Sequence, residues 1–130
     1  INQYLKLVSN GGSLVPTPLL SVAADLYEDE AHVADIRAYY HTNFALAERH
    51  LGVSPPQGGF FLWLKVDDDV QFVKRLMEEQ AVRALPGSFM GVETADGNPG
   101  AGYVRLALVH DAKITDEALV RIAKIYKSHA

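Results

Sequence analysis

Apolar residues in the first half of the chain follow a helical spacing. They recur every three or four positions over residues 1–8, 18–29 and 30–51, which places them on one face of each predicted helix. The clearest stripe lies in the third segment and consists of Val33, Ile36, Tyr40, Phe44, Ala47 and Leu51. Glycines and prolines over residues 10–18 separate the first two helices, and Gly52 ends the third.

Two later segments have the composition of buried strands. Residues 60–66 and 103–109 are almost wholly apolar and aromatic, which predicts strands covered on both faces. A third, shorter strand is predicted over residues 81–85. Further helices are predicted over residues 68–80, after three aspartates that suit a helix N-terminus, and from Thr115 onward. This order of elements predicts an α+β domain, in which helices cover a small, mainly antiparallel sheet.

Composition and charge limit the possible partners. The chain has 130 residues, of which 48% are hydrophobic and 22% charged, as in one globular domain. Its net charge of -4 disfavours nucleic acid and anionic membranes as partners. No apolar run approaches the ~18 residues that a membrane-spanning helix needs. The absence of cysteine excludes disulfides and thiol catalysis.

The histidines and carboxylates predict no metal site. His32, His41 and His50 are nine residues apart on one predicted helix, so neighbours point to opposite sides. His32 and His50 share a side but lie ~27 Å apart, too far to bind one ion. We therefore expect surface histidines. The carboxylate runs, Asp67-Asp68-Asp69 among them, lie at predicted helix ends, where capping and solvation explain them.

Arg105 is the exception within the predicted buried strands. It lies between Val104 and Leu106, where an unpaired guanidinium would be very costly to bury. Its five donors require a carboxylate or phosphate partner. From composition alone that partner is either an acidic side chain of the fold or a bound ligand.

Three blocks of sequence resemble fold-type I aminotransferases, which depend on pyridoxal phosphate. These blocks are PPQGGFFLWL at 55–64, ALPGSFMG at 84–91 and GYVRLA at 102–107. They follow one another as in the small C-terminal domain of that family. Residues 11–18 and 27–33 look most like the N-succinyldiaminopimelate aminotransferase branch. The resemblance covers essentially the whole chain.

The resemblance implies roles for several residues. Arg105 matches the arginine that binds the α-carboxylate of the substrate, and Phe60 or Phe61 would line the pocket beside it. Gly12 and Ser13 would lie where the family's chain approaches the active site of a partner subunit, although a plain turn between helices remains an alternative. The family therefore implies amino acid and keto acid substrates and a homodimer.

The family's catalytic half has no match in this chain. Transamination needs a lysine that holds pyridoxal phosphate as a Schiff base, in a Ser-x-x-Lys context. No lysine has that context; the lysines are Lys6, Lys65, Lys74, Lys113, Lys124 and Lys127. We therefore expect residues 1–130 to be a single C-terminal small domain, preceded by interdomain helices over about 1–52, with the large cofactor domain absent. Alone, the chain should bind no cofactor, contain no catalytic residue and be inactive.

The expected function of the parent is amino transfer in the cytoplasm. It would pass an amino group from glutamate to a keto acid, with N-succinyl-2-amino-6-ketopimelate of lysine and diaminopimelate synthesis as the expected acceptor. The alternative is a non-catalytic, stand-alone domain that binds small acids or other proteins. A decarboxylase or lyase of the same fold type would also use Arg105.

Overall fold

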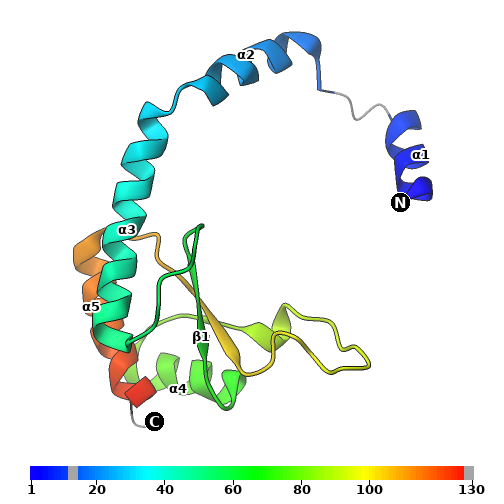
Figure 1. The fold of residues 1–130 in the computed structure, drawn as a ribbon. Coiled ribbons are helices and arrows are strands. Elements are labelled where there is room, and N and C mark those ends of the chain that lie inside the picture. The colour runs from blue at the N-terminus through cyan, green and yellow to red at the C-terminus, as the bar shows by residue number, and fades with distance from the viewer. Residues whose placement is uncertain (12–14, 128–130) are drawn as a thin grey trace. The chain divides into compact units, whose positions relative to one another are not determined.

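A computed structural model describes residues 1–11 and 15–127. The chain consists of two compact units, Ile1–Ile36 and Arg37–Ala130. The first unit holds α1 (Asn2–Asn10), α2 (Thr17–Glu28) and the start of α3 (Ala31–Leu51). Figure 1 shows the order of the elements along the chain.

The first unit consists of helices at the positions that the spacing predicts. Neither α1 nor α2 contains a buried residue. The exposed apolar side chains of α2 are Leu19, Leu20, Val22, Leu26 and Tyr27. Pro16 takes the N-cap position, so α2 begins at Thr17, one residue before the proline of its first turn. Helices without buried residues contribute no core of their own.

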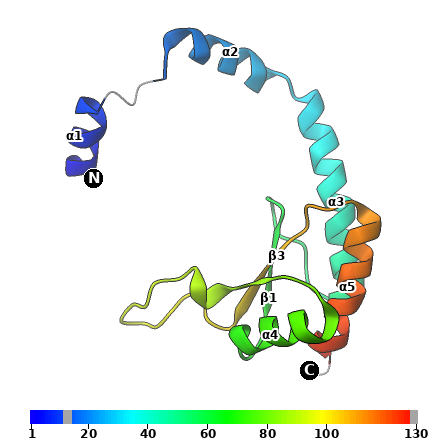
Figure 2. The same cartoon turned by 180° about the vertical axis from the view of Figure 1, so that it is seen from behind.

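The second unit is built on a three-stranded antiparallel sheet with the order β1-β3-β2. The strands are β1 (Phe61–Lys65), β2 (Leu85–Pro86) and β3 (Tyr103–Ala107). The central strand β3 contains Arg105, which pairs with Trp63 on one side and Leu85 on the other. Figure 2 shows this sheet from behind, with the loop between β2 and β3 extending from it.

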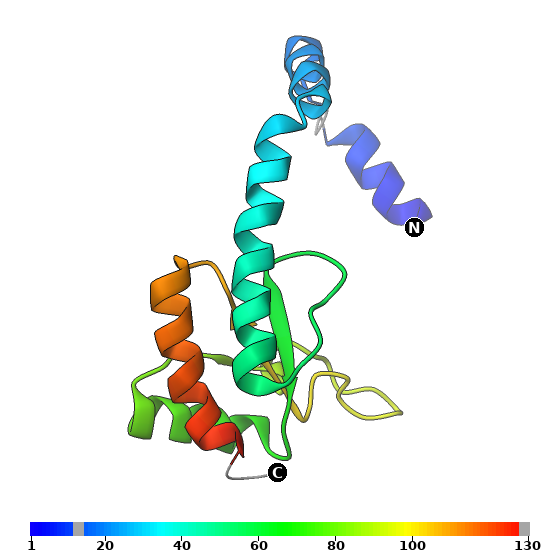
Figure 3. The ribbon, with the colours of Figure 1, turned by 60° about the vertical axis from the view of Figure 1, so that its left-hand side comes forward.

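Helices cover one face of the sheet. The C-terminal half of α3 lies beside α5 (Ala112–Tyr126), and α4 (Asp69–Gln80) crosses beneath the strands (Figure 3). The core between helices and sheet consists of Phe44, Ala47, Leu51, Leu62, Leu64, Phe72, Leu76, Val104, Leu106, Leu108, Leu119, Ile122 and Ile125. This arrangement confirms the α+β class and the small antiparallel sheet.

The prediction that the strands are covered on both faces is wrong for the described chain. Leu62 and Leu64 are buried, whereas Trp63 between them is 47% exposed. In β3, Val104 and Leu106 are buried and Tyr103 is exposed. Successive side chains of a strand point to opposite faces, and the helices cover only one of them. We call the uncovered side, with Phe61, Trp63, Lys65, Tyr103, Arg105 and Ala107, the open face.

Two element boundaries differ from the prediction. Ala81 ends α4 in the left-handed conformation, and the Val82 N–H donates to Leu76 O, so residues 81–84 form no strand. The last helix begins at Ala112 rather than Thr115, because the Asp111 side chain caps it. Within the described residues, no helix has the length and apolar character to cross a membrane.

Candidate functional site

Arg105 stands at the centre of the open face. It is half-buried in the middle of β3, between two cross-strand neighbours. Its guanidinium lies over the ring of Phe61, with Cζ 4.3 Å from the ring centroid. A cation over an aromatic face gains about 0.5–2 kcal/mol, depending on solvent exposure. The contact therefore fixes the direction of the guanidinium without using its hydrogen-bond donors.

Aromatic side chains continue from Phe61 along the edge of the sheet. Phe60 lies against Phe61 at a centroid distance of 4.3 Å and stacks on Tyr40 of α3 at 5.6 Å. Phe61 therefore contacts Arg105 directly, and Phe60 contacts Phe61. Gly12 and Ser13, the other predicted pocket residues, lie outside the described residues.

Arg105 has no acidic partner among residues 1–11 and 15–127. The ion pairs of these residues join other groups: Asp29–His32, Arg49–Asp116, His50–Asp116, Arg75–Glu79 and Glu117–Arg121. The sequence left two partners open for Arg105, an acidic side chain of the fold or a bound ligand. The described residues do not supply the acidic side chain. The planar fork of donors is available to a carboxylate, which it can bind through two parallel hydrogen bonds.

Asp69 supports the strand that carries Arg105, and the sequence analysis missed it. Asp68 caps α4 by accepting from Gln71 N at 2.9 Å, as a helix-end aspartate should. Asp69 is instead 6% exposed and accepts from Ser88 N at 2.8 Å and Gly102 N at 3.4 Å. The sequence held one weak signal for Asp69. Only one residue can cap a helix, so capping does not explain why the run Asp67-Asp68-Asp69 contains two further aspartates.

Burial and hydrogen bonding have opposite effects on Asp69. Burial raises its pKa, but donors from Ser88 and Gly102 together outweigh burial, so the pKa lies below the ordinary value of 3.8. The carboxylate is thus ionised at neutral pH. It can accept hydrogen bonds from both backbone segments at once.

The other end of β3 is fixed by α3. Asn43 is buried, and its Nδ2 donates to Leu108 O and His110 O, both at 2.9 Å. The Tyr39 hydroxyl donates to Val109 O at 3.2 Å. These contacts hold the exit of the strand against the helix, some 65 residues away in sequence.

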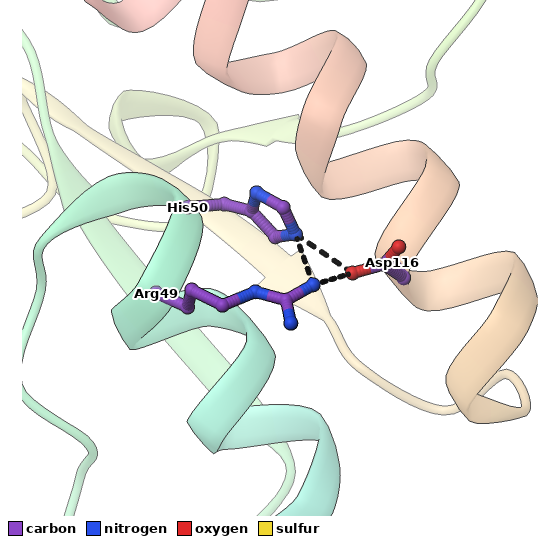
Figure 4. A network of polar contacts seen from close by, with 3 residues as sticks. All are labelled: Arg49, His50 and Asp116. Atoms are coloured by element: carbon purple, nitrogen blue, oxygen red, sulfur yellow. Dashed lines mark hydrogen bonds and ion pairs between the residues drawn. The ribbon is translucent and has the colours of Figure 1, made fainter.

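One histidine is more than a surface residue. His50 Nε2 and Arg49 both contact Asp116 Oδ1 at 2.7 Å, which joins α3 to α5 (Figure 4). The hydrogen bond to His50 is the main cause of the lowered pKa of Asp116; burial opposes it and Arg49 adds to it. His32 and His41 are exposed as expected, and the described residues contain no group of three or more potential metal ligands.

A family profile identifies the family to which this chain belongs. The profile described as "Aminotransferase class I and II" matches residues 1–122. The chain belongs to this family. An aminotransferase from Neisseria meningitidis has a similar structure, with a TM-score of 0.79 and 34% identity over 96% of this chain and 33% of that one. Aminotransferase AspB from Helicobacter pylori, at 24% identity and a TM-score of 0.77, shares the fold.

Curated aminotransferases are similar over shorter stretches. LL-diaminopimelate aminotransferase of Nitratidesulfovibrio vulgaris is 34% identical over 73 residues, 54% of this chain and 17% of the relative. L-glutamine--4-(methylsulfanyl)-2-oxobutanoate aminotransferase of Bacillus subtilis is 32% identical over 113 residues, 81% of this chain and 27% of the relative. The chain thus spans about a quarter or less of their length.

The described lysines of this chain do not fit a cofactor site at Arg105. Lys65 is exposed at the end of β1, opposite Tyr103 in the register. Lys74, Lys113 and Lys124 are exposed on α4 and α5, which cover the other face of the sheet. The side chains that contact Arg105 or pair with it across the sheet are Phe61, Trp63 and Leu85, and none of these three could form a Schiff base with pyridoxal phosphate.

Proposed function

We propose that this chain is the substrate-clamping part of a pyridoxal-phosphate-dependent aminotransferase. Arg105 carries the proposal, because a half-buried guanidinium with no acidic partner among the described residues stands at the centre of the open face. A charge-assisted hydrogen bond contributes about 1.5–3 kcal/mol, and a bidentate pair also fixes orientation.

Arg105 would bind the substrates of both half-reactions. The amino donor and the keto acceptor share the α-carboxylate, so one guanidinium can hold either in the same place. Phe61 keeps the fork of donors aligned by lying against its face, at 4.3 Å from Cζ. Phe60 beside it would exclude water from that edge of the pocket. Holding the substrate in one orientation lowers the entropy cost of the chemical step.

The remaining machinery would lie outside these 130 residues. The reactive lysine and the site of pyridoxal phosphate, which serves as electron sink when bound, are proposed for a large domain of the same polypeptide. Residues 1–130 would be the C-terminal small domain with interdomain helices over about 1–52. The parent is proposed to be a cytoplasmic homodimer, in which Gly12 and Ser13 approach the partner subunit's site.

The proposed acceptor is N-succinyl-2-amino-6-ketopimelate, with glutamate as donor. The motif at 11–18 and 27–33 supports this branch. Two curated relatives from desulfovibrio-type bacteria are LL-diaminopimelate aminotransferases, which supports a diaminopimelate-type substrate in lysine synthesis. Other relatives are named as aminotransferases of aspartate and of 4-(methylsulfanyl)-2-oxobutanoate, so the relatives share the reaction type and differ in substrate.

Arg105→Lys in the full-length enzyme tests the clamp. Lysine keeps the charge but loses the planar fork, so we expect KM for glutamate to rise and kcat to fall, with kcat/KM about 100-fold lower. Arg75→Lys is the matched control, because Arg75 pairs with Glu79 on α4 behind the sheet. Unchanged kinetics in Arg105→Lys would remove the basis of the proposal.

One second function is favoured by a specific observation. The described open face presents Arg105 with Lys65 as its one lysine, which lacks the Ser-x-x-Lys context, and such a face would also serve a non-catalytic domain that binds small acids. The intact mass of the polypeptide in its own organism separates the two. A mass about three times 14.3 kDa would fit the enzyme, since the chain covers 33% of a similar aminotransferase structure. A mass of 14.3 kDa would fit the binding domain.

A further inference from the structure

The direction of Arg105 depends on where its strand begins and where the neighbouring strand ends. β3 begins at Tyr103, directly after Gly102, and β2 ends at Pro86, two residues before Ser88. A shift of either boundary would change the register beside Arg105. The guanidinium would then move relative to Phe61 and to any bound carboxylate.

Asp69 is bonded to both boundaries. Its Oδ2 accepts from Ser88 N at 2.8 Å, and its Oδ1 accepts from Gly102 N at 3.4 Å. Gly102 in turn accepts from Val66 N at 2.8 Å, which joins the start of β3 to the end of β1. A single buried carboxylate at the start of α4 therefore ties together the ends of all three strands.

The loop between the two boundaries is packed too closely to absorb a shift. A Cβ at Gly87 would lie 2.3 Å from Gly100 O, and one at Gly100 would lie 2.1 Å from Gly87 O. Asn98 crosses the same loop, with Nδ2 donating to Ser88 O and Oδ1 accepting from Gly100 N, both at 2.9 Å. Contacts of this density transmit a displacement instead of damping it.

Trp63 connects this loop to Arg105. The Cβ position of Gly87 is 3.0 Å from Trp63 Cζ3, so the indole packs directly on the glycine backbone. Trp63 is also the cross-strand partner of Arg105. The loop and the guanidinium thus share a neighbour on the open face, while Asp69 acts from the opposite, helix-covered side.

We propose that Asp69 is a positioning residue for Arg105: it sets the ends of β2 and β3 and thereby aims the guanidinium at the substrate carboxylate. This inference rests on the proposed function of Arg105. Asp69 touches no substrate in this scheme. It acts through the backbone of Ser88 and Gly102, which its ionised carboxylate holds by charge-assisted hydrogen bonds.

Asp69→Asn in the cofactor-loaded, full-length enzyme tests the inference. The amide turns one acceptor into a donor that faces backbone N–H groups, with almost no change in volume. We expect KM for an α-amino acid to rise about tenfold, because small misplacements of a binding group have large kinetic effects. The ratio of kcat/KM between that amino acid and the matching amine without a carboxylate should fall by about the same factor.

Asp68→Asn is the matched control. Asp68 precedes Asp69, caps the same helix through Gln71 N and has no bond to Ser88 or Gly102. It should leave the ratio between the two substrates unchanged. An equal effect of both substitutions, or an equal loss with amino acid and amine, would mean that Asp69 only stabilises the fold, and the inference would be wrong.

A double-mutant cycle separates this inference from the proposed function. In an Arg105→Lys background, Asp69→Asn should have little further effect on the substrate ratio, since the group that it aims is already gone. If Arg105→Lys itself changes nothing, the proposed function fails. If Arg105→Lys lowers the ratio and Asp69→Asn does not, only the positioning role fails.

A second variant keeps the test decisive if Asp69→Asn does not fold. Asn98→Ala removes the two side-chain bonds that hold Ser88 O and Gly100 N, while the helix cap remains. It should lower the substrate ratio in the same direction, by about threefold, because Asp69 still holds the loop. An unchanged ratio in a folded Asn98→Ala enzyme would contradict the role of this loop in aiming Arg105.

Discussion

Removal of the Asn43 side chain should loosen the exit of β3. Asn43 is 1% exposed and donates two hydrogen bonds of 2.9 Å, to Leu108 O and His110 O. Each bond contributes about 0.5–1.5 kcal/mol net, and a buried carbonyl left without a donor costs about 1–3 kcal/mol. Because Leu108 is buried and His110 is exposed, the loss of the bond to Leu108 O is counted at the full penalty and the loss of the bond to His110 O at the net value. Asn43→Ala should therefore reduce local stability by about 2–4 kcal/mol.

Native-state hydrogen exchange can measure this loss at the strand itself. The Leu108 N–H donates to Phe60 O at 3.0 Å, so its exchange reports the opening of β3 from β1. A loss of about 2–4 kcal/mol corresponds to roughly 30- to 900-fold faster exchange, at 1.36 kcal/mol per factor of ten. Local measurement is preferable to a melting curve, because a chain with two compact units need not unfold in one step.

Two further variants make the Asn43 result interpretable. Thr42→Ala is the control, since Thr42 is exposed and its hydroxyl donates to Ala38 O within the same helix, α3. It should change stability by less than about 0.5 kcal/mol. Asn43→Leu keeps the number and branching of the side-chain heavy atoms and loses both donors, so its exchange should accelerate as in Asn43→Ala. If Leu108 exchanges at the same rate in all of these proteins, the assigned role of the two hydrogen bonds is refuted.

Two other predictions concern the loop and the contact between helices. Gly87→Ala should destabilise the protein by about 1–3 kcal/mol or more, because its Cβ would lie 2.3 Å from Gly100 O; Gly58→Ala, with nothing within 4 Å, is the control in thermal melts. Asp116 has a folded pKa below 3.8, so its contribution to stability is present above the unfolded pKa and is lost as pH falls through the folded value. Asp116→Asn should therefore be less stable than the wild type at pH 7, and the difference should vanish at low pH in urea titrations. A pH-independent difference would show that the ionised carboxylate is not what stabilises the contact with His50.

Local rules predicted the helices better than they predicted the sheet. Apolar spacing alone located α3, since a stripe of six positions over five turns has no other simple explanation. The apolar runs predicted where the strands lie, but they did not predict that one face of the sheet is exposed. A continuous apolar run such as 60–66 indicates that both faces need cover, and it does not say which segment provides it. In the described chain the helices supply cover for one face only.

The residues that the sequence analysis missed act over long distances in the chain. Asp69 bonds to groups 19 and 33 residues away, and His50 meets Asp116 across 66 residues. No periodicity or capping rule connects such positions. Arg105 was singled out because a charge within an apolar run violates a local rule, whereas Asp69 lies in a run of helix-end aspartates that capping explains as a group, and so gave only a weak signal.

The proposed clamp would also divide into two physical tasks, performed by different parts of the parent protein. Orientation belongs to this chain: Phe61 aligns the guanidinium, while Asp69 and Asn43 fix the two ends of its strand. The strength of carboxylate binding depends on whether Arg105 is shielded from water. An exposed ion pair contributes only about 0–1 kcal/mol, and a desolvated charge-assisted bond contributes more. Substitutions at Asp69 should therefore change which substrates are preferred, since they misdirect the fork of donors. Substitutions in whatever covers Trp63 and Tyr103 should instead weaken all carboxylates alike, since they admit water to a guanidinium that still points the right way.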